Sequence, residues 1–549
     1  MSTSDTSGST ASGDPSSTGT DSPTTGGEPS STGADTPTTG ASTGGGTSTS
    51  SGPGQSTGPD DPGCGTTDVG ESCGDSSGGE PPPPVCPPGA SPPPPTTIVD
   101  GVIPSLPWDL APVTGTEHIV ASKDELLAAA AIAAPGDAIS IVGGTYDGWG
   151  EVVVPASASG TEDAPIVIRS HMEPVTFTGA TRLTISGDHV HVYGLSFTGV
   201  AAEALKVDGA SPAEPAVGVR LSMIHCRETI GQCLLVGDAL GTRFDHSLIE
   251  KSQSKGVHVG NESRFTRIDH NVFRDRPKPD QNNGFEQIQL GHMRYTGTND
   301  GVDTMVFSRT DALVDHNVFH ECKGEGEMIG IKTSGNKIVF NVIADAHDLG
   351  RLSFRGGPNN LAYGNVFRDT HGAVRLLGKS NRVLHNLVVD PNQYPGIDLA
   401  WGSDMAYQPD NKLYYTVDYI ASRQGLIQHN TVAMTAHASS TGRALADDKQ
   451  SPDECEIGSK ADVIECTVTP FDNTFKANLF VNDDENATVK LSPEMVDMNT
   501  YVDNVAALGP VATLGTTPEM TAALASTFPA PAGDLADIHR ALADFVWAP

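Results

Sequence analysis

The sequence predicts an all-β protein whose main domain is a parallel β-helix, preceded by a disordered, low-complexity arm. Three observations support this fold class. Short β-branched runs bounded by Gly, Asp or Pro fill residues 138–485, with no long helical pattern among them. A short motif recurs through the same region at a nearly constant interval. The stretch before it, residues 1–98, is mostly Ser, Thr, Gly, Pro and Asp and has almost no large apolar side chains.

The arm at residues 1–98 cannot bury enough apolar surface to offset the entropy lost on ordering, so we expect it to be disordered. Two proline runs, 81–84 and 92–95, suit an extended spacer. Residues 99–549 then form the β-helix domain. The formal net charge of −35 argues against nucleic acid as a partner. It also gives an acidic polymer no long-range attraction, so local cations would have to recruit a polyanion.

The domain opens with an expected helix over residues 122–134. Ser122 and Glu125 have the spacing of a capping box, and the Pro-Gly pair at 135–136 would end the helix. Because an open solenoid end invites pairing with other chains, we expect this helix to cover the first end of the β-helix. The C-terminal segment, about 510–549, would cover the other end or pack along the side.

The recurring motif is an Asn followed by two mostly hydrophobic residues, often after a His. Its Asn position, which is Ser in the first copy, falls at 247, 271, 317, 341, 365, 386, 430 and 478. The intervals are 21–24 residues or about twice that length, as expected for one or two coils of a parallel β-helix. An Asn at one position per coil can stack as a hydrogen-bonded ladder at a tight turn, because Asn tolerates the left-handed conformation. We therefore interpret these Asn residues, and the His residues before them, as structural.

The cellular location follows from indirect signals. No run of about 18 apolar residues exists, so we expect no membrane span. No signal peptide follows Met1, yet a long Ser/Thr/Gly/Pro arm is typical of an exported protein. We expect a secreted or cell-surface protein, with a signal or lipid anchor upstream of this sequence. Cys455 and Cys466 bracket a ten-residue polar loop, and a disulfide between them would fit export; two free thiols are the alternative.

A candidate site lies where charged residues interrupt the repeat. Glu325 and Glu327 are two residues apart, so in a strand they point to the same side. Two parallel carboxylates are costly without a cation between them. With the amide oxygen of Asn283 they form an all-oxygen set suited to Ca²⁺. A solvated acidic strand edge is the alternative interpretation.

Basic residues on neighbouring repeats could join these carboxylates, since successive coils lie about 4.8 Å apart. They are Lys332, Arg355 and Arg375. The offset of five residues from Glu327 to Lys332 is odd, and strict alternation would put the two side chains on opposite faces. A bend or bulge near Gly330 is therefore required.

These segments resemble the core signature of polysaccharide lyase family 6, which contains alginate lyases and chondroitinase B. The matching runs are NGFEQIQLG, DHNVFHECKGEGEMIGIKTSGN and GRLSFRGG, and the resemblance covers about residues 115–440. It implies a right-handed parallel β-helix that cleaves a uronate polymer by β-elimination with Ca²⁺ as cofactor. Lys332 would be the base and Arg355 the acid. Asn283, Glu325 and Glu327 would bind the metal. The substrate-binding residues that the resemblance implies are Arg375, Gln289, Glu286, His292 and Arg276.

The sequence departs from the family pattern near the catalytic residues. The family has Arg where this chain has Gln289, and usually His where it has Gly356. These changes put the identity of the substrate in doubt. We expect alginate, with dermatan sulfate as the alternative. Two other readings remain: a non-catalytic carbohydrate-binding β-helix or adhesin, and a hydrolase with paired Asp residues. Asp269 and Asp315 sit in the repeat motif, which disfavours the hydrolase.

Overall fold

The chain divides into two units, Met1–Pro88 and Gly89–Pro549. The computed structural model describes part of the second unit. The described residues are 110–277, 284–292, 294–296, 304–323, 326–346, 350–389, 391, 395–400, 402–404, 406–407, 413–414, 421–434, 445–448, 456–457, 464–468, 470–482, 489–490 and 497–508. The arm at 1–98 and the segment after residue 508 lie outside these ranges, so the predictions for them stay predictions.

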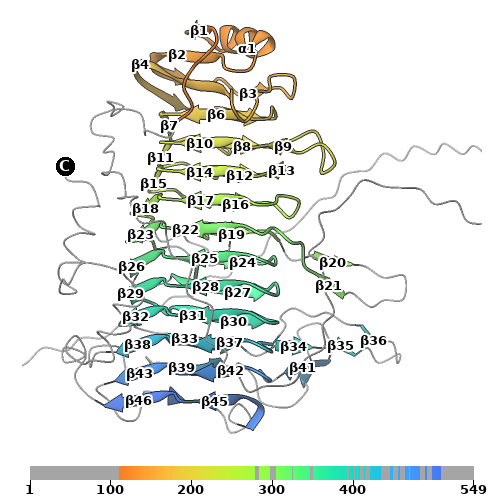
Figure 1. Cartoon of the computed structure of the whole chain (residues 1–549), viewed down its shortest axis with the longest axis vertical. Coiled ribbons are helices and arrows are strands. Elements are labelled where there is room, and N and C mark those ends of the chain that lie inside the picture. The colour runs from red at the N-terminus through yellow and green to blue at the C-terminus, as the bar shows by residue number, and fades with distance from the viewer. Residues whose placement is uncertain are drawn as a thin grey trace, which may run out of the picture. The chain divides into compact units, whose positions relative to one another are not determined.

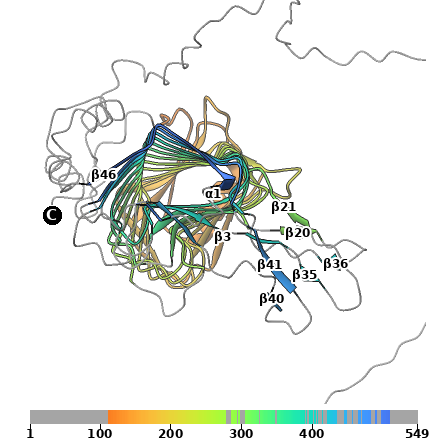
Figure 2. The same ribbon diagram turned by 90° about the horizontal axis from the view of Figure 1, so that it is seen from below.

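The described part is a parallel β-helix, as predicted, in which the strands of the two large sheets pair in parallel with strands of the neighbouring coils. Figure 1 shows the coils stacked along the long axis, and Figure 2 shows them superposed when seen along it. Each regular coil contributes three short strands, one to each of three rows. Two of the rows join into one sheet through the long strands β2 and β4, and the third row is a separate sheet.

The strands of the three rows have the following bounds. The first row contains β1 (Glu117–Val120), β2 (Ala138–Asp147), β4 (Ile166–Thr178), β6 (Val190–Tyr193), β10 (Arg220–Ser222), β14 (Arg243–Asp245), β17 (Arg267–Asp269), β22 (Leu313–Asp315), β25 (Lys337–Val339), β28 (Leu361–Tyr363), β31 (Arg382–Leu384), β37 (Leu426–Gln428), β42 (Thr474–Lys476) and β45 (Thr500–Val502). The second row continues from β2 and β4 with β7 (Leu195–Thr198), β11 (His225–Arg227), β15 (Leu248–Glu250), β18 (Val272–Arg274), β23 (Val318–His320), β26 (Val342–Ala346), β29 (Val366–Thr370), β32 (Leu387–Val389), β38 (Thr431–Met434), β43 (Leu479–Asn482) and β46 (Val505–Leu508). The third row contains β3 (Glu151–Val154), β5 (Arg182–Ile185), β8 (Leu205–Val207), β12 (Leu234–Val236), β16 (Val257–Val259), β19 (Ile288–Leu290), β24 (Glu327–Ile331), β27 (Arg351–Gly356), β30 (Val374–Gly378), β33 (Ile397–Ala400), β39 (Leu445–Asp448) and β44 (Val489–Lys490).

The remaining strands form small sheets in the connections between coils. They are β9 (Ala216–Val217) with β13 (Ala239–Leu240), β20 (Arg294–Thr296) with β21 (Thr304–Val306), β34 (Gly402–Asp404) and β40 (Glu456–Ile457) with β41 (Ile464–Val468), and β35 (Ala406–Tyr407) with β36 (Leu413–Tyr414). Most of them project sideways from the stack (Figure 2).

The α-helix near the start of the described residues, α1 (Lys123–Ile132), caps the N-terminal end of the stack as predicted (Figure 1). The hydroxyl of Ser122 accepts a hydrogen bond from the backbone N–H of Glu125 at 3.3 Å. The Glu125 carboxylate reaches back to the N–H of Ala121 at 2.7 Å, so the reciprocal cap is made one residue further out than expected. Leu126 and its neighbours on one helix face are buried in the same core cluster as the first coils. No helix among the described residues is long and apolar enough to span a membrane.

The motif Asn residues form a continuous internal ladder, which confirms their structural interpretation. Asn341 is fully buried, and its amide donates to the side-chain oxygen of Asn365 at 3.0 Å and to the carbonyl of Val314 at 2.9 Å. Its own side-chain oxygen accepts from the backbone and amide of Asn317, both at 3.0 Å. The ladder runs past Asn478 to Asn504. From Ser247 to Asn504, each coil is therefore joined to the next by polar bonds inside a hydrophobic core.

The prediction that the ladder Asn adopts the left-handed conformation is wrong. The left-handed conformation belongs to the residue before each ladder Asn, as at His270 (φ 57°) and His316 (φ 55°). Those imidazoles stack outside the turn with ring centroids 5.1 Å apart, and each contacts the Asp before it at 2.9 Å. The His residues of the motif are therefore structural, as predicted.

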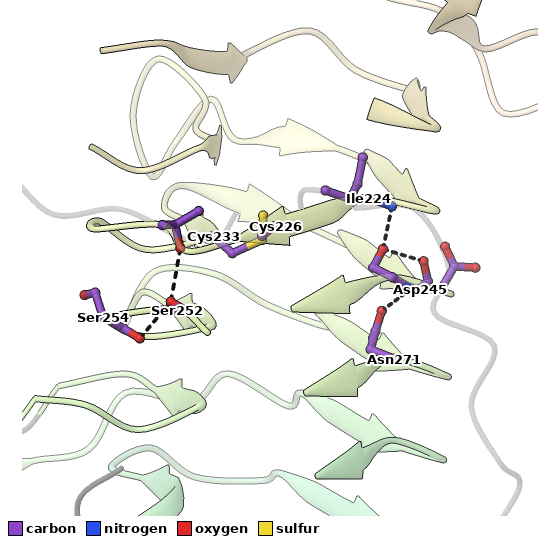
Figure 3. Close-up of a disulfide and its surroundings, with 9 residues drawn as sticks. Ile224, Cys226, Cys233, Asp245, Ser252, Ser254 and Asn271 are labelled. Atoms are coloured by element: carbon purple, nitrogen blue, oxygen red, sulfur yellow. Dashed lines mark hydrogen bonds between the residues drawn. A yellow bond between two sulfur atoms is a disulfide. The ribbon is translucent and has the colours of Figure 1, made fainter. Parts of the chain in front are cut away.

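A disulfide that the sequence analysis did not predict joins Cys226 to Cys233 at one corner of a coil (Figure 3). Beside it, the hydroxyl of Thr229 donates to that of Ser252 on the next coil at 3.1 Å. Cys455 lies outside the described residues, so its pairing with Cys466 stays a prediction. Cys322 is a buried free thiol.

Candidate active site

The candidate site lies on the outward face of the third row, where four neighbouring strands are in register. Gly330 of β24 pairs with Ser353 of β27, which pairs with Arg375 of β30 and then Asp398 of β33. The residues on either side, such as Leu352 and Phe354, are buried in the core. Alternation within the strand therefore sends the polar residues at this level outward.

The required bulge is present, but at Met328 and not at Gly330. The pairing of β24 with β27 matches Glu327 to Arg351 and then Ile329 to Leu352, so Met328 is the extra residue. Its side chain turns into the core. Because of this extra residue, the side chains of Glu327 and Lys332 can lie on the same face of the strand and take part in one site.

Lys332 is held by Glu286, which lies just before β19. The ammonium nitrogen contacts Glu286 Oε1 at 2.9 Å, and the Glu286 side chain is fully buried. Burial alone would raise the pKa of Glu286, but the charge and hydrogen bond of Lys332 outweigh it and keep the pKa below its usual value. The second carboxylate oxygen, Oε2, is buried and has no hydrogen-bond partner among the described residues.

Arg355 is held in the same way by Glu327, with 3.4 Å between Nη1 and Oε2. The two carboxylates meet over Gly330. A Cβ placed at Gly330 would lie 3.2 Å from Glu286 Oε1 and 3.2 Å from Glu327 Oε2. Two acidic and two basic side chains from three coils thus surround one glycine, and this arrangement brings together the predicted base, the predicted acid and one predicted metal ligand.

Arg375 lies on the C-terminal side of this group and shares a carboxylate with Arg351. Asp398, which is 1% exposed, lies 3.0 Å from Arg351 and 3.7 Å from the Nε of Arg375. Arg351 and Asp398 are not among the site residues predicted from the sequence. The alternation of Arg351, Ser353 and Arg355 in the run RLSFR was a usable signal, because i and i+2 residues of a strand share a face.

Gln289 and His292 lie on the N-terminal side. The amide of Gln289 donates to the carbonyl of Gly291 at 2.7 Å and lies 3.1 Å from Nδ1 of His292. His258, a residue that the sequence analysis did not consider, packs edge-on against His292 with ring centroids 4.5 Å apart. Burial, together with the charges of His292 and Lys255, lowers the pKa of His258 to about 3, so this imidazole is neutral near pH 7.

Arg276 does not reach the exposed face of the site. It is 2% exposed, donates to the carbonyl of Phe285 and lies with its guanidinium carbon 5.5 Å from the Phe285 ring. The structure therefore gives it a supporting position beneath the segment that carries Glu286. Its role in binding substrate stays a prediction.

The predicted metal ligands are only partly described. Glu327 is placed, but Asn283 and Glu325 lie outside the described residues. Within the described part of the chain, no group of three or more His, Cys, Asp or Glu side chains is arranged to hold a metal ion.

Comparisons with known proteins agree with the fold. A family model described as chondroitinase B matches residues 120–518. The PL6 family alginate lyase AlyGC matches with a TM-score of 0.54 and 23% identity, over 71% of this chain and 51% of that chain. The PL6 family polysaccharide lyase Pedsa3628 from Pseudopedobacter saltans matches with a TM-score of 0.54 and 18% identity, over 73% of this chain and 94% of that chain. A mannuronic acid specific family 6 lyase from human gut microbiota matches with a TM-score of 0.52 and 18% identity, over 78% and 95%.

These structural likenesses concern the fold, and the chain spans about half the length of AlyGC. No curated protein matches the chain. The family model, however, covers most of the sequence, from the strand before the capping helix to beyond the last described coil. The protein therefore belongs to the chondroitinase B family.

Proposed function

We propose that this protein is a polysaccharide lyase that cleaves a uronate-containing polymer, alginate in the first place, by β-elimination. The observation that carries the proposal is the pairing of Lys332 with Glu286 and of Arg355 with Glu327 around Gly330. This arrangement places an amine and a guanidinium on one outward face, as the elimination requires. Two structural matches described as alginate or mannuronic acid lyases support the choice of polymer.

In the proposed reaction the Lys332 ammonium first releases a proton to solvent, and the free amine then takes the proton from C5 of the uronate. The electron pair of the broken C–H bond forms the C4–C5 double bond, and the C4–O4 bond breaks. Arg355 donates a hydrogen bond to the departing O4, which takes up one proton from solvent as it leaves. The products are a 4,5-unsaturated uronate end and a new hydroxyl end. Glu286 and Glu327 hold the two basic side chains in place during this reaction.

The carboxylates fit the Ca²⁺ that we propose as cofactor. Glu286 Oε2 is buried without a hydrogen-bond partner among the described residues, and Glu327 Oε2 lies across Gly330 from the same side chain. Carboxylate and amide oxygens are the ligands that Ca²⁺ prefers, so we propose Glu327 with Glu325 and Asn283 as its ligands and Glu286 as a neighbour. Bound Ca²⁺ would withdraw charge from the sugar carboxylate and so make the C5 proton more acidic.

The proposal is tested by incubating the protein with alginate and with dermatan sulfate. A lyase raises the near-UV absorbance as unsaturated ends form, and a chelator should reduce the rate. The matching family model is described as chondroitinase B, and we propose dermatan sulfate as the second candidate polymer. New reducing ends without absorbance would indicate hydrolysis, and no product from either polymer would indicate a binding protein.

We further propose that the protein is exported. The disulfide between Cys226 and Cys233 supports this, because disulfides persist in oxidising compartments and are rare in the cytosol. Detection of the protein outside the cells or on their surface would test it, and its retention in the cytosol would contradict it.

A further inference from the structure

Arg351, Asp398 and Arg375 form a cluster beside the candidate active site that the reaction itself does not use. They come from β27, β33 and β30, three consecutive coils. The carboxylate of Asp398 is nearly inaccessible, with its side chain 1% exposed. The side chains of Arg351 and Arg375 are 9% and 13% exposed, so both are largely buried but keep some contact with solvent.

Asp398 brings the two arginines together. Arg351 lies at the start of β27, level with Glu327, and its side chain crosses the coil of β30 to reach Asp398 at 3.0 Å. Arg375 lies directly beside Asp398 in the register of β30 and β33. A single buried acceptor thus fixes two long side chains that would otherwise lose considerable conformational freedom on binding a ligand.

The position of this cluster sets what it can bind. Arg375 is two coils away from Gly330 and the strand that leads to Lys332. Two strand spacings correspond to roughly 10 Å, which is longer than one sugar ring. A polymer lying across the coils with its reacting C5 at Lys332 would therefore place the next sugar unit, and not the reacting one, over the arginines.

Resting on the proposed function, we propose that Asp398 is a positioning residue that holds Arg351 and Arg375 as a paired guanidinium site for the carboxylate of the sugar unit next to the one that is cleaved. Guanidinium groups suit planar carboxylates because they offer parallel N–H donors. The enzyme then requires a polymer with consecutive uronate units. A chain in which uronates alternate with uncharged sugars would leave this pair without its ligand.

The test measures binding without turnover, in the Lys332→Ala background, by titration calorimetry with an alginate oligosaccharide. Adding Arg351→Met or Asp398→Asn should weaken the affinity about tenfold, the factor for losing one hydrogen bond to a charged group. The matched control is Arg267→Met, which removes an arginine paired with Asp315 at 2.8 Å in the first row and should leave the affinity unchanged. Unchanged affinity in Arg351→Met would overturn the inference.

Two further measurements separate this role from a merely structural one. In the otherwise wild-type enzyme, Arg351→Met should raise KM with little change in kcat. An oligosaccharide whose carboxylates are reduced to alcohols outside the cleaved unit should bind the parent protein about tenfold less tightly, yet show no further loss in Arg351→Met. If reducing the carboxylates weakened binding to Arg351→Met by the same factor as binding to the parent protein, the inference would be contradicted.

The outcomes also distinguish this inference from the proposed function. If the oligosaccharide binds with the expected pattern but the wild-type protein produces no unsaturated ends, the lyase proposal fails and the paired site stands. If Asp398→Asn does not fold, as judged by circular dichroism, the result with Arg351→Met decides alone.

Discussion

At the scale of one residue, the candidate site can form because Gly330 has no side chain. The carboxylates of Glu286 and Glu327 occupy the space that a side chain at position 330 would take, with 3.2 Å from the ideal Cβ to an oxygen of each. Those two carboxylates fix Lys332 and Arg355. A methyl group at this position would therefore displace Lys332 and Arg355, the proposed catalytic residues, through the carboxylates that hold them.

We predict that Gly330→Ala lowers kcat/KM about tenfold or more, because a displacement of a few tenths of an ångström moves both basic groups away from the substrate. The matched control is Gly326→Ala, where a Cβ meets nothing within 4 Å, and its activity should stay close to that of the wild type. Steady-state rates of absorbance increase provide the measurement. Equal rates in the two variants would refute the role given to Gly330.

A second prediction at this scale concerns His191 on β6. Burial, together with the nearby charge of Arg220, lowers the pKa of His191 to about 4. The unfolded chain takes up a proton near the ordinary pKa of 6.5, whereas the folded protein does not, so stability is greatest above pH 6.5 and falls as the pH drops toward 4. Between pH 7 and pH 5 this group should cost roughly 1–2 kcal/mol of unfolding free energy.

Urea denaturation of the wild type and of His191→Gln at pH 7 and pH 5 measures this contribution. The glutamine variant should show a smaller loss between the two pH values. An identical loss in both proteins would mean that His191 does not carry the dependence.

At the scale of the elements, the sequence predicted the coils and one of the two Asn ladders that join them, but not the second ladder. A second Asn ladder runs five residues before the first, at Asn336, Asn360 and Asn381 and again at Asn473 and Asn499. Its period matches the first, but Gly425 takes the corresponding position in one coil. The residues after these Asn vary, so no recurring motif marked them in the sequence.

The ladder makes a stability prediction. Asn341→Ala removes an amide that has hydrogen-bond partners on both neighbouring coils, and the buried groups left behind cannot reach water. We expect a loss of roughly 2–3 kcal/mol. Asn504→Ala, at the part-buried end of the ladder, is the matched control and should cost less. Denaturant midpoints measure both, and a similar cost for the two would argue against a cooperative ladder.

Some contacts of the candidate site could be predicted from the sequence, and others could not. Glu327, Lys332 and Arg355 could be grouped because a regular period stacks their coils and alternation assigns their faces. The contact of Lys332 with Glu286, 46 residues earlier, could not be derived, since the chain between β19 and β24 departs from the period and holds the β20–β21 hairpin. The location of the bulge at Met328 likewise depends on how the side chains pack in the core.

At the scale of the whole molecule, a rigid stack explains how a chain with a net charge of −35 could act on a polyanion. Parallel pairing sets Lys332, Arg355, Arg351 and Arg375 on one face, through three consecutive strands of the third row or their ends. The cationic groups are thus concentrated where a polymer would lie, although the chain as a whole is acidic. Local recognition then replaces long-range attraction, and association should be slower than for a basic lyase.

Elimination by Lys332 on this face can be measured by following near-UV absorbance during incubation with alginate, using the wild-type protein and Lys332→Ala. The account predicts unsaturated ends from the wild type and a rate at least about 10²-fold lower in the variant, the usual contribution of a general base. A variant that folds normally and produces absorbance at the wild-type rate would contradict the account.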